Sequence, residues 1–201
     1  MPASPSASKR RLTPDDILPL ADYATVRRER RREITDLKKQ RRIEVGPCAT
    51  FYFENWLTMW QQVQEMLYIE KGGEAQLADE LAAYNPLIPR GSELVATVMF
   101  EIADAARRAA VLSGLGGVEH RIFIEVAGER IAGEPDPSRE NTSAEGKASA
   151  VQFLRFPFTP AQIAAFRRPD ARILAGFDHA NYGHLAVLPE PVRAALAEDF
   201  D

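Results

Sequence analysis

Short segments in which apolar and polar residues alternate recur along this 201-residue chain, and single helices or pairs of helices separate them. Alternation with a period of two is typical of strands that have one face in a core and the other in water. The regular strand–helix–strand order of a parallel sheet, with its continuous Val and Ile runs, is not seen. The sequence therefore predicts an α+β fold with a mainly antiparallel, twisted sheet and helices packed on one face. The predicted strands are residues 42–45, 49–53, 94–100, 120–126, 151–156, 172–177 and 185–188.

A strongly basic helix is predicted ahead of the strands, from about residue 22 to residue 40. Its apolar residues are few, which is typical of a helix that lies on a domain rather than inside it. Residues 1–42 hold 12 Lys and Arg against 6 Asp and Glu, whereas residues 43–201 hold 13 against 23, and the net charge is −4. We interpret the basic face as solvated, or as lying on the acidic body of the same chain. The acidic balance of the whole chain does not favour a nucleic-acid-binding protein.

The chain is expected to form one domain, residues 12–201, behind a disordered tail of residues 1–11. Residues 134–149 contain no large apolar side chain, so we expect them to form a mobile insertion. No segment is apolar enough to span a membrane and no secretory signal is recognisable, so we expect a cytoplasmic protein. The single cysteine, Cys48, excludes a disulfide within one chain.

A polar strip on the helix predicted to begin at residue 56 is the most unusual stretch of the sequence. Glu54, Thr58, Gln61 and Glu65 are spaced by 4, 3 and 4 residues, so they share one face of the helix, which Tyr68 extends. That face contains no Lys or Arg, although solvated helix faces usually do. Two interpretations remain open: a binding pocket in which Glu65 is a base or a ligand, or a buried network that fixes the helix. The candidate binding residues are Glu54, Asn55, Thr58, Gln61, Gln64, Glu65 and Tyr68.

A second candidate site lies near the end of the chain, where Asp178, His179 and His184 surround a predicted turn. Histidine and carboxylate side chains can hold a transition metal and leave one coordination position open. The separation of five residues between the histidines matches neither one helix face nor one strand face, which argues against a metal site. The alternative interpretation is that these histidines are solvated turn residues.

Common catalytic motifs are missing from the sequence. There is no Gly-x-Ser-x-Gly elbow, no His-Glu-x-x-His and no phosphate-binding Walker loop. Gly114-Leu115-Gly116-Gly117 follows a predicted helix, whereas a dinucleotide fingerprint precedes one. The sequence therefore identifies neither a reaction nor a cofactor, and it leaves open whether the protein is an enzyme.

Several short motifs resemble those of one bacterial family. They are Leu12-Thr13-Pro14-Asp15-Asp16-Ile17, Phe53-Glu54-Asn55, Gln64-Glu65-Met66 and Asn85-Pro86-Leu87-Ile88-Pro89. With these motifs the chain resembles the family called domain of unknown function 3501 over nearly its whole length from Leu12. The resemblance implies a role beside a rubrerythrin-like or iron–sulfur redox system and identifies no catalytic residue.

Taken together, these observations indicate an accessory or interaction protein of the cytoplasm that uses the helices at 22–42 and 54–68 as contact surfaces. Its expected partner is another protein, such as a redox protein, and a homodimer is also open. The alternative function is a small metal-binding protein or enzyme with a carboxylate and histidine pocket.

Overall fold

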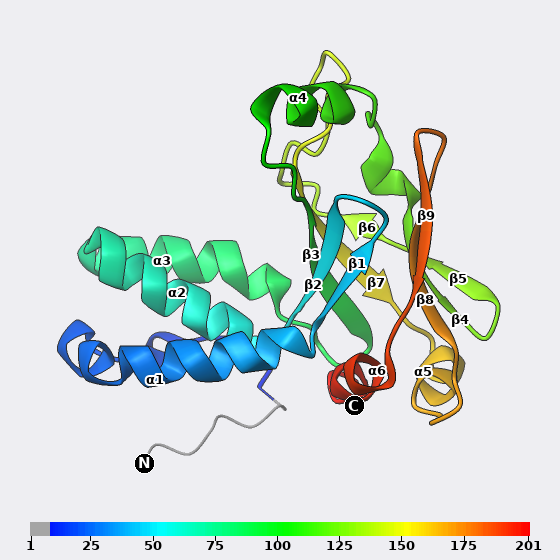
Figure 1. Cartoon of the computed structure of the whole chain (residues 1–201). Helices are drawn as coiled ribbons and strands as arrows, with labels where there is room; N and C mark the ends of the chain where they lie inside the picture. Colours follow the sequence, from blue (N-terminus) through cyan, green and yellow to red (C-terminus); the bar gives the residue numbers. More distant parts are fainter. Residues whose placement is uncertain (1–8) are drawn as a thin grey trace.

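The computed structural model describes residues 9–201, and within this range it contains two antiparallel sheets and six α-helices (Figure 1). The predicted α+β class with antiparallel pairing is confirmed, but the strands form two sheets where one was expected. The first sheet has the order β1 (Arg42–Val45), β2 (Ala49–Glu54), β3 (Glu93–Phe100), β7 (Val151–Pro157) and β6 (Glu134–Pro135). The second has the order β5 (Glu129–Ala132), β4 (Ile122–Val126), β8 (Ile173–His179) and β9 (Tyr182–Val187). The helices are α1 (Leu20–Lys39), α2 (Trp56–Glu70), α3 (Gly73–Tyr84), α4 (Ala105–Ser113), α5 (Pro160–Phe166) and α6 (Glu190–Ala197).

The main hydrophobic core lies between the two sheets. Phe51 of β2 is fully buried at its centre, and its ring centroid lies 5.4 Å from that of Phe177 on β8 and 6.5 Å from that of Phe156 on β7. Val98 of β3 and Ile124 of β4 are buried in the same cluster. Both sheets therefore bury one apolar face against the other, which is the arrangement of a β-sandwich.

A second core joins the helices to the outer face of the first sheet. Tyr23 of α1, Trp60 and Val63 of α2, and Val95 of β3 are buried in this cluster, and Phe153 of β7 packs against it. Residues on opposite faces of a strand alternate, so Val95 lies on the helical side of β3 while its neighbours reach the sandwich core. Helices α1, α2 and α3 thus form a layer on one side of the molecule (Figure 1).

Local sequence signals explain where the helices begin. Asn55 caps α2, because its side chain accepts a hydrogen bond from the Thr58 amide at 3.0 Å while the Thr58 hydroxyl accepts one from the Asn55 amide at 2.9 Å. Thr159 caps α5 in the same way. Before α1, Thr13 is followed by a single 3₁₀ turn over Pro14–Asp16, and α1 begins just after Pro19.

Arg41, directly after α1, connects the helical layer to the sandwich and to the C-terminal end. It is almost fully buried, donates hydrogen bonds to the Phe53 carbonyl at 3.1 Å and the Glu54 carbonyl at 3.2 Å, and forms an ion pair with buried Asp199. Burial raises the pKa of the Asp199 carboxyl, and the Arg41 guanidinium opposes this shift. The sequence analysis did not anticipate this buried pair.

The two segments predicted to be mobile or disordered can be followed only in part. Residues 1–8 of the predicted tail lie outside the described residues, while the Arg10 guanidinium donates a hydrogen bond to the Asp199 carbonyl at 3.0 Å. Residues 134–149 include β6, and the Gln152 side chain donates hydrogen bonds to the carbonyls of Asn141 and Ser149. The mobility of residues 134–149 stays a prediction. No helix in the described part of the chain has the length and apolar character needed to cross a membrane.

Candidate functional site

The polar strip of α2 faces α1 and the segment before it. Gln64 is completely buried, and its amide oxygen accepts a hydrogen bond from the Leu18 amide at 2.6 Å while its amide nitrogen donates to the Leu18 carbonyl at 3.3 Å. The Gln64 side chain thus pairs with both backbone groups of Leu18, as a neighbouring strand would. A buried peptide group needs such partners for its N–H and its carbonyl. Gln64 therefore holds the chain just ahead of α1.

Glu65 is the centre of the contact between α1 and α2. The Arg27 guanidinium donates two hydrogen bonds to the Glu65 carboxylate, at 2.9 and 2.8 Å, and the Tyr23 hydroxyl donates a third at 2.6 Å. Hydrogen bonding by Arg27 lowers the pKa of the Glu65 carboxyl below its usual value, although partial burial opposes the shift. Burial and the neighbouring Glu65 carboxylate raise the pKa of the Tyr23 hydroxyl. Glu65 is therefore an ionised structural partner of Arg27.

The remaining candidates on this strip are also held by groups of the same chain. The Gln61 amide nitrogen donates to the Tyr23 hydroxyl at 2.5 Å, and Tyr68 packs its ring under the Arg27 guanidinium, 4.6 Å from carbon to centroid. Glu54 accepts hydrogen bonds from the hydroxyls of Thr58 at 2.6 Å and Thr97 at 2.7 Å. Only the Gln61 Oε1 atom is buried without a partner among the described residues of this strip. Gln61, Gln64 and Glu65 therefore form a seam with α1 and the segment before it. Glu54, predicted on the same helix face, is instead the last residue of β2 and faces Thr97 of β3.

The residues of the second candidate site are not brought together as one ligand set. In the β8–β9 hairpin, Asp178 lies opposite Gly183 while His179 lies opposite Tyr182, so Asp178 is on the other face of the hairpin from the two histidines. Asp178 pairs with Arg130 at 3.0 Å, and the His184 ring packs on Tyr182 with centroids 4.6 Å apart. Across residues 9–201 no three His, Cys, Asp or Glu side chains are grouped closely enough to hold a metal ion.

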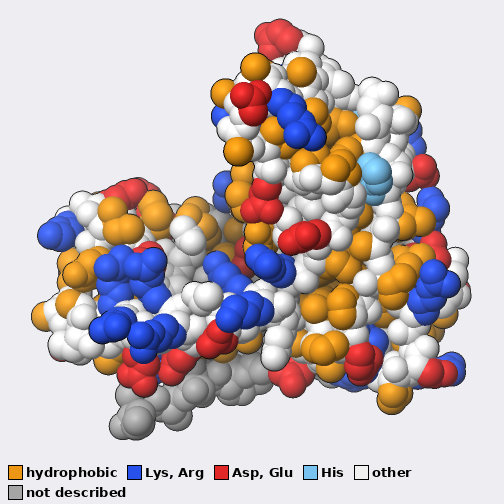
Figure 2. Space-filling view, viewed as in Figure 1, with side chains coloured by type: hydrophobic (Ala, Val, Ile, Leu, Met, Phe, Trp, Pro, Cys, Tyr) orange, Lys and Arg blue, Asp and Glu red, His pale blue; other side chains and the backbone are white. Residues whose placement is uncertain are grey.

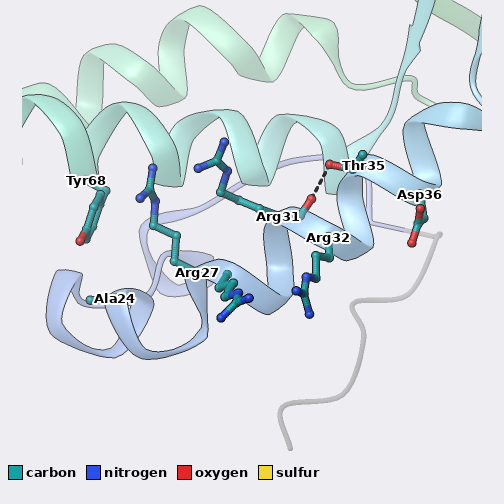
Figure 3. Close-up of a pocket in the computed structure, with 8 residues that line it drawn as sticks. Ala24, Arg27, Arg31, Arg32, Thr35, Asp36 and Tyr68 are labelled. Carbon is teal, nitrogen blue, oxygen red and sulfur yellow. Dashed lines mark hydrogen bonds between the residues drawn. The ribbon is translucent and has the colours of Figure 1, made fainter.

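A basic groove on α1 is the site that the structure adds. Figure 2 shows Lys and Arg side chains gathered over α1, at the helical end of the molecule. Beside them lies a groove of about 620 Å³ between α1 and the end of α2. Arg27 and Arg31 point toward α2, whereas Arg32 points away from it (Figure 3). We call this surface the arginine groove; it is lined by Ala24, Arg27, Arg28, Arg31, Arg32, Thr35, Asp36 and Tyr68.

Not all positive charges of the arginine groove are available to a ligand. Arg27 is neutralised by Glu65, as described above. Arg28, Arg31 and Arg32 are exposed, and none of them forms an ion pair with any residue in the range 9–201. At the far end of the groove, Asp36 is paired with Lys39 at 2.7 Å. Three neighbouring arginines of α1 therefore have no ion-pair partner within residues 9–201.

Comparisons with known proteins agree on the family and on the fold. A search of curated proteins gives no match. A crystal structure from Burkholderia pseudomallei, described as a novel protein of unknown function, superposes with a TM-score of 0.87 and is 37% identical in sequence. The match covers 94% of this chain and 99% of that one. The model of a family described as protein of unknown function (DUF3501) matches residues 11–200, so the predicted resemblance is confirmed and the chain belongs to the DUF3501 family.

Proposed function

We propose that this protein is an accessory protein of the cytoplasm that binds an acidic protein partner through the arginine groove. The observation that carries the proposal is the set of three exposed arginines, Arg28, Arg31 and Arg32, none of which forms an ion pair within residues 9–201. A cluster of like charges repels itself, and an acidic surface that covers it removes this repulsion and speeds encounter. The groove beside the arginines gives such a partner a shaped surface.

The arrangement of the carboxylates supports a binding role more than a catalytic one. Glu54, at the end of β2, and Glu65, on α2, are the candidate acids of this region, and each accepts hydrogen bonds from two other side chains. A general base must instead reach a proton of the substrate. In the arginine groove, the charged groups without an ion-pair partner among residues 9–201 are therefore arginine side chains of α1.

The partner that the family resemblance implies is a redox protein. Rubrerythrin-like and iron–sulfur proteins from the same cell are therefore the first purified partners to test against the arginine groove. The resemblance supports this choice, and the charge of the groove adds that the contact surface of the partner should be acidic.

Charge reversal with a matched control tests the proposal. The test variant carries Arg28→Glu, Arg31→Glu and Arg32→Glu. The control carries Arg107→Glu, Arg121→Glu and Arg172→Glu, which change the net charge equally at exposed positions on other parts of the surface. A partner captured from cell extract is identified, purified and titrated against all three proteins.

We expect the partner to bind the wild type and the control alike and the test variant at least about tenfold more weakly, since each lost contact with a charged group is worth roughly 1 kcal/mol. Raising the salt concentration should weaken wild-type binding. Both triple variants should unfold within about 0.5 kcal/mol of the wild type, because exposed side chains outside special positions contribute little to stability. Equal binding by the test variant and the control would contradict the proposal.

A further inference from the structure

We infer that the partner element recognised by the arginine groove is an acidic helix that lies along α1 and carries an apolar side chain at one end. This inference rests on the proposed function and specifies the segment of the partner that makes the contact. It is carried by the spacing of the groove residues, by two exposed apolar side chains at the end of the groove and by the surroundings of Tyr68.

The groove residues of α1 form one stripe along the helix. Leu20, Ala24, Arg28, Arg31 and Thr35 follow one another at intervals of 4, 4, 3 and 4 residues, which places them on one face. At 1.5 Å per residue the stripe is about 22 Å long, with one residue per turn of about 5.4 Å. Its two arginines, Arg28 and Arg31, are three residues apart, and a second helix with carboxylates one turn apart repeats that distance.

The walls of the groove leave room for such a helix. Ala24 contributes only a methyl group to the α1 side of the groove, and on the α2 side Tyr68 points toward α1 (Figure 3). Helices packed side by side prefer axis separations of 8–10 Å, which small residues at the contact permit. A helix can therefore lie along the open side of the groove, over α1, without being enclosed by it.

Apolar side chains are exposed at one end of the stripe. Leu20 is 40% exposed and Ile69 is 63% exposed, and both rank among the large hydrophobic residues that the described chain leaves open to solvent. Leu20 begins α1 and Ile69 follows Tyr68 near the end of α2. The Tyr23 and Tyr68 rings lie 5.8 Å apart, so the start of α1 and the end of α2 are neighbours. We take these two side chains as the place where the apolar side chain of the partner docks, as in interfaces that combine an apolar centre with a charged rim.

The same surroundings argue against a nucleic acid as the ligand. Tyr68 is the only aromatic residue that lines the groove in the described chain. One face of its ring is covered by the Arg27 guanidinium, so the groove offers a base one half-covered ring, whereas single-strand binders stack successive bases on several aromatic side chains. A small phosphate is also disfavoured, because the stripe runs along the middle of α1, where the backbone N–H groups are already used within the helix.

Three fluorescent probes test the inference by anisotropy at low salt. The first is a capped helical peptide of about 16 residues with glutamates at one-turn spacing along one face and a leucine at one end of that face. The second has the same composition with its glutamates spread around the helix. The third is a single-stranded oligonucleotide of equal charge. We expect the first peptide to bind about fivefold more tightly than the second and to bind more tightly than the oligonucleotide.

Variants of the protein locate the binding. The Arg28→Glu, Arg31→Glu, Arg32→Glu protein should bind the first peptide about tenfold more weakly, while the Arg107→Glu, Arg121→Glu, Arg172→Glu control should bind it as the wild type does. The double variant Leu20→Ser, Ile69→Ser should bind the first peptide about threefold more weakly than the wild type does, and its affinity for the second peptide should be unchanged. Equal binding of the two peptides, or binding of neither, would overturn the helical element while the captured partner still tests the proposed function. Tighter binding of the oligonucleotide would overturn both.

Discussion

The sandwich core and the α1–α2 seam are built from different kinds of side chain. Between the sheets, rings such as Phe51 and Phe177 and aliphatic residues such as Val98 fill the interior. At the seam, the aromatic residues of the helical layer are accompanied by a row of Gln and Glu side chains paired with α1. Apolar contacts are tolerant of small shifts, whereas hydrogen bonds fix direction and register. The comparison suggests that the sandwich supplies most of the stability and that the seam sets where α1, and with it the arginine groove, is placed.

The largest effect is expected from Phe51→Ala in the sandwich. Phe51 is fully buried and touches rings from both sheets, so its removal leaves a cavity and should lower the free energy of unfolding by about 3–5 kcal/mol. Urea denaturation followed by circular dichroism measures the loss. Leu185→Ala, which removes an apolar side chain that is 57% exposed on β9, is the control and should change stability by less than about 0.5 kcal/mol. A loss below about 1 kcal/mol for Phe51→Ala would contradict the role given to the sandwich.

A smaller and more local effect is expected from Glu65→Ala in the seam. The change removes the acceptor of both Arg27 and Tyr23 and should cost about 2 kcal/mol, because hydrogen bonds to charged groups are stronger than neutral ones. Hydrogen exchange should become faster in α1 and remain slow in β2 and β3. Glu29→Ala, at an exposed position of α1, is the control and should leave the hydrogen exchange of α1 unchanged. Uniformly faster exchange in both regions would mean that the seam is not a separate unit.

The smallest effect concerns the pH dependence of the seam. The pKa of Glu65 is lowered in the folded protein, so its contribution to stability is complete above the ordinary glutamate pKa, 4.5, and is lost as the pH falls through the lowered folded value. The difference in unfolding free energy between the wild type and Glu65→Gln should therefore be largest near neutral pH, at about 1 kcal/mol, and should shrink below about pH 4. Paired urea titrations across this range measure the difference, in which the other carboxylates cancel. A difference that stays constant with pH would show that the ionised form of Glu65 contributes nothing.

Much of the local structure could be predicted from the sequence, because its signals act over a few residues. The start of α2 was predicted at residue 56, where the structure has it, and the alternation of apolar and polar residues predicted most of the strands. The division into two sheets was missed, since alternation shows that a strand has a buried face but not which strand it pairs with. In the structure, β4 pairs with β5 and β8, and β8 pairs with β9, so these four strands form a sheet of their own.

The candidate site shows the same division. The spacing of Gln61 and Glu65 correctly placed them on one face, and the lack of Lys and Arg on that face indicated that it is not an ordinary solvated one. The sequence could not show that the missing cation is Arg27, which lies 38 residues earlier in the chain. Nor could it show that Tyr68 and Arg31 line one groove, because this depends on how α1 packs against α2.

By itself the sequence determined the fold class, the ends of several helices, the excess of arginine in α1 and the family motifs. These depend on side-chain size, periodicity and backbone preference within one segment. The tertiary structure decided that Arg27 is neutralised by Glu65 while Arg28, Arg31 and Arg32 form no ion pair within residues 9–201, because such pairs depend on contacts between segments that are far apart in the chain. That pairing divides a basic run into a seam with α2 on one side and an exposed, unpaired arginine cluster on the other.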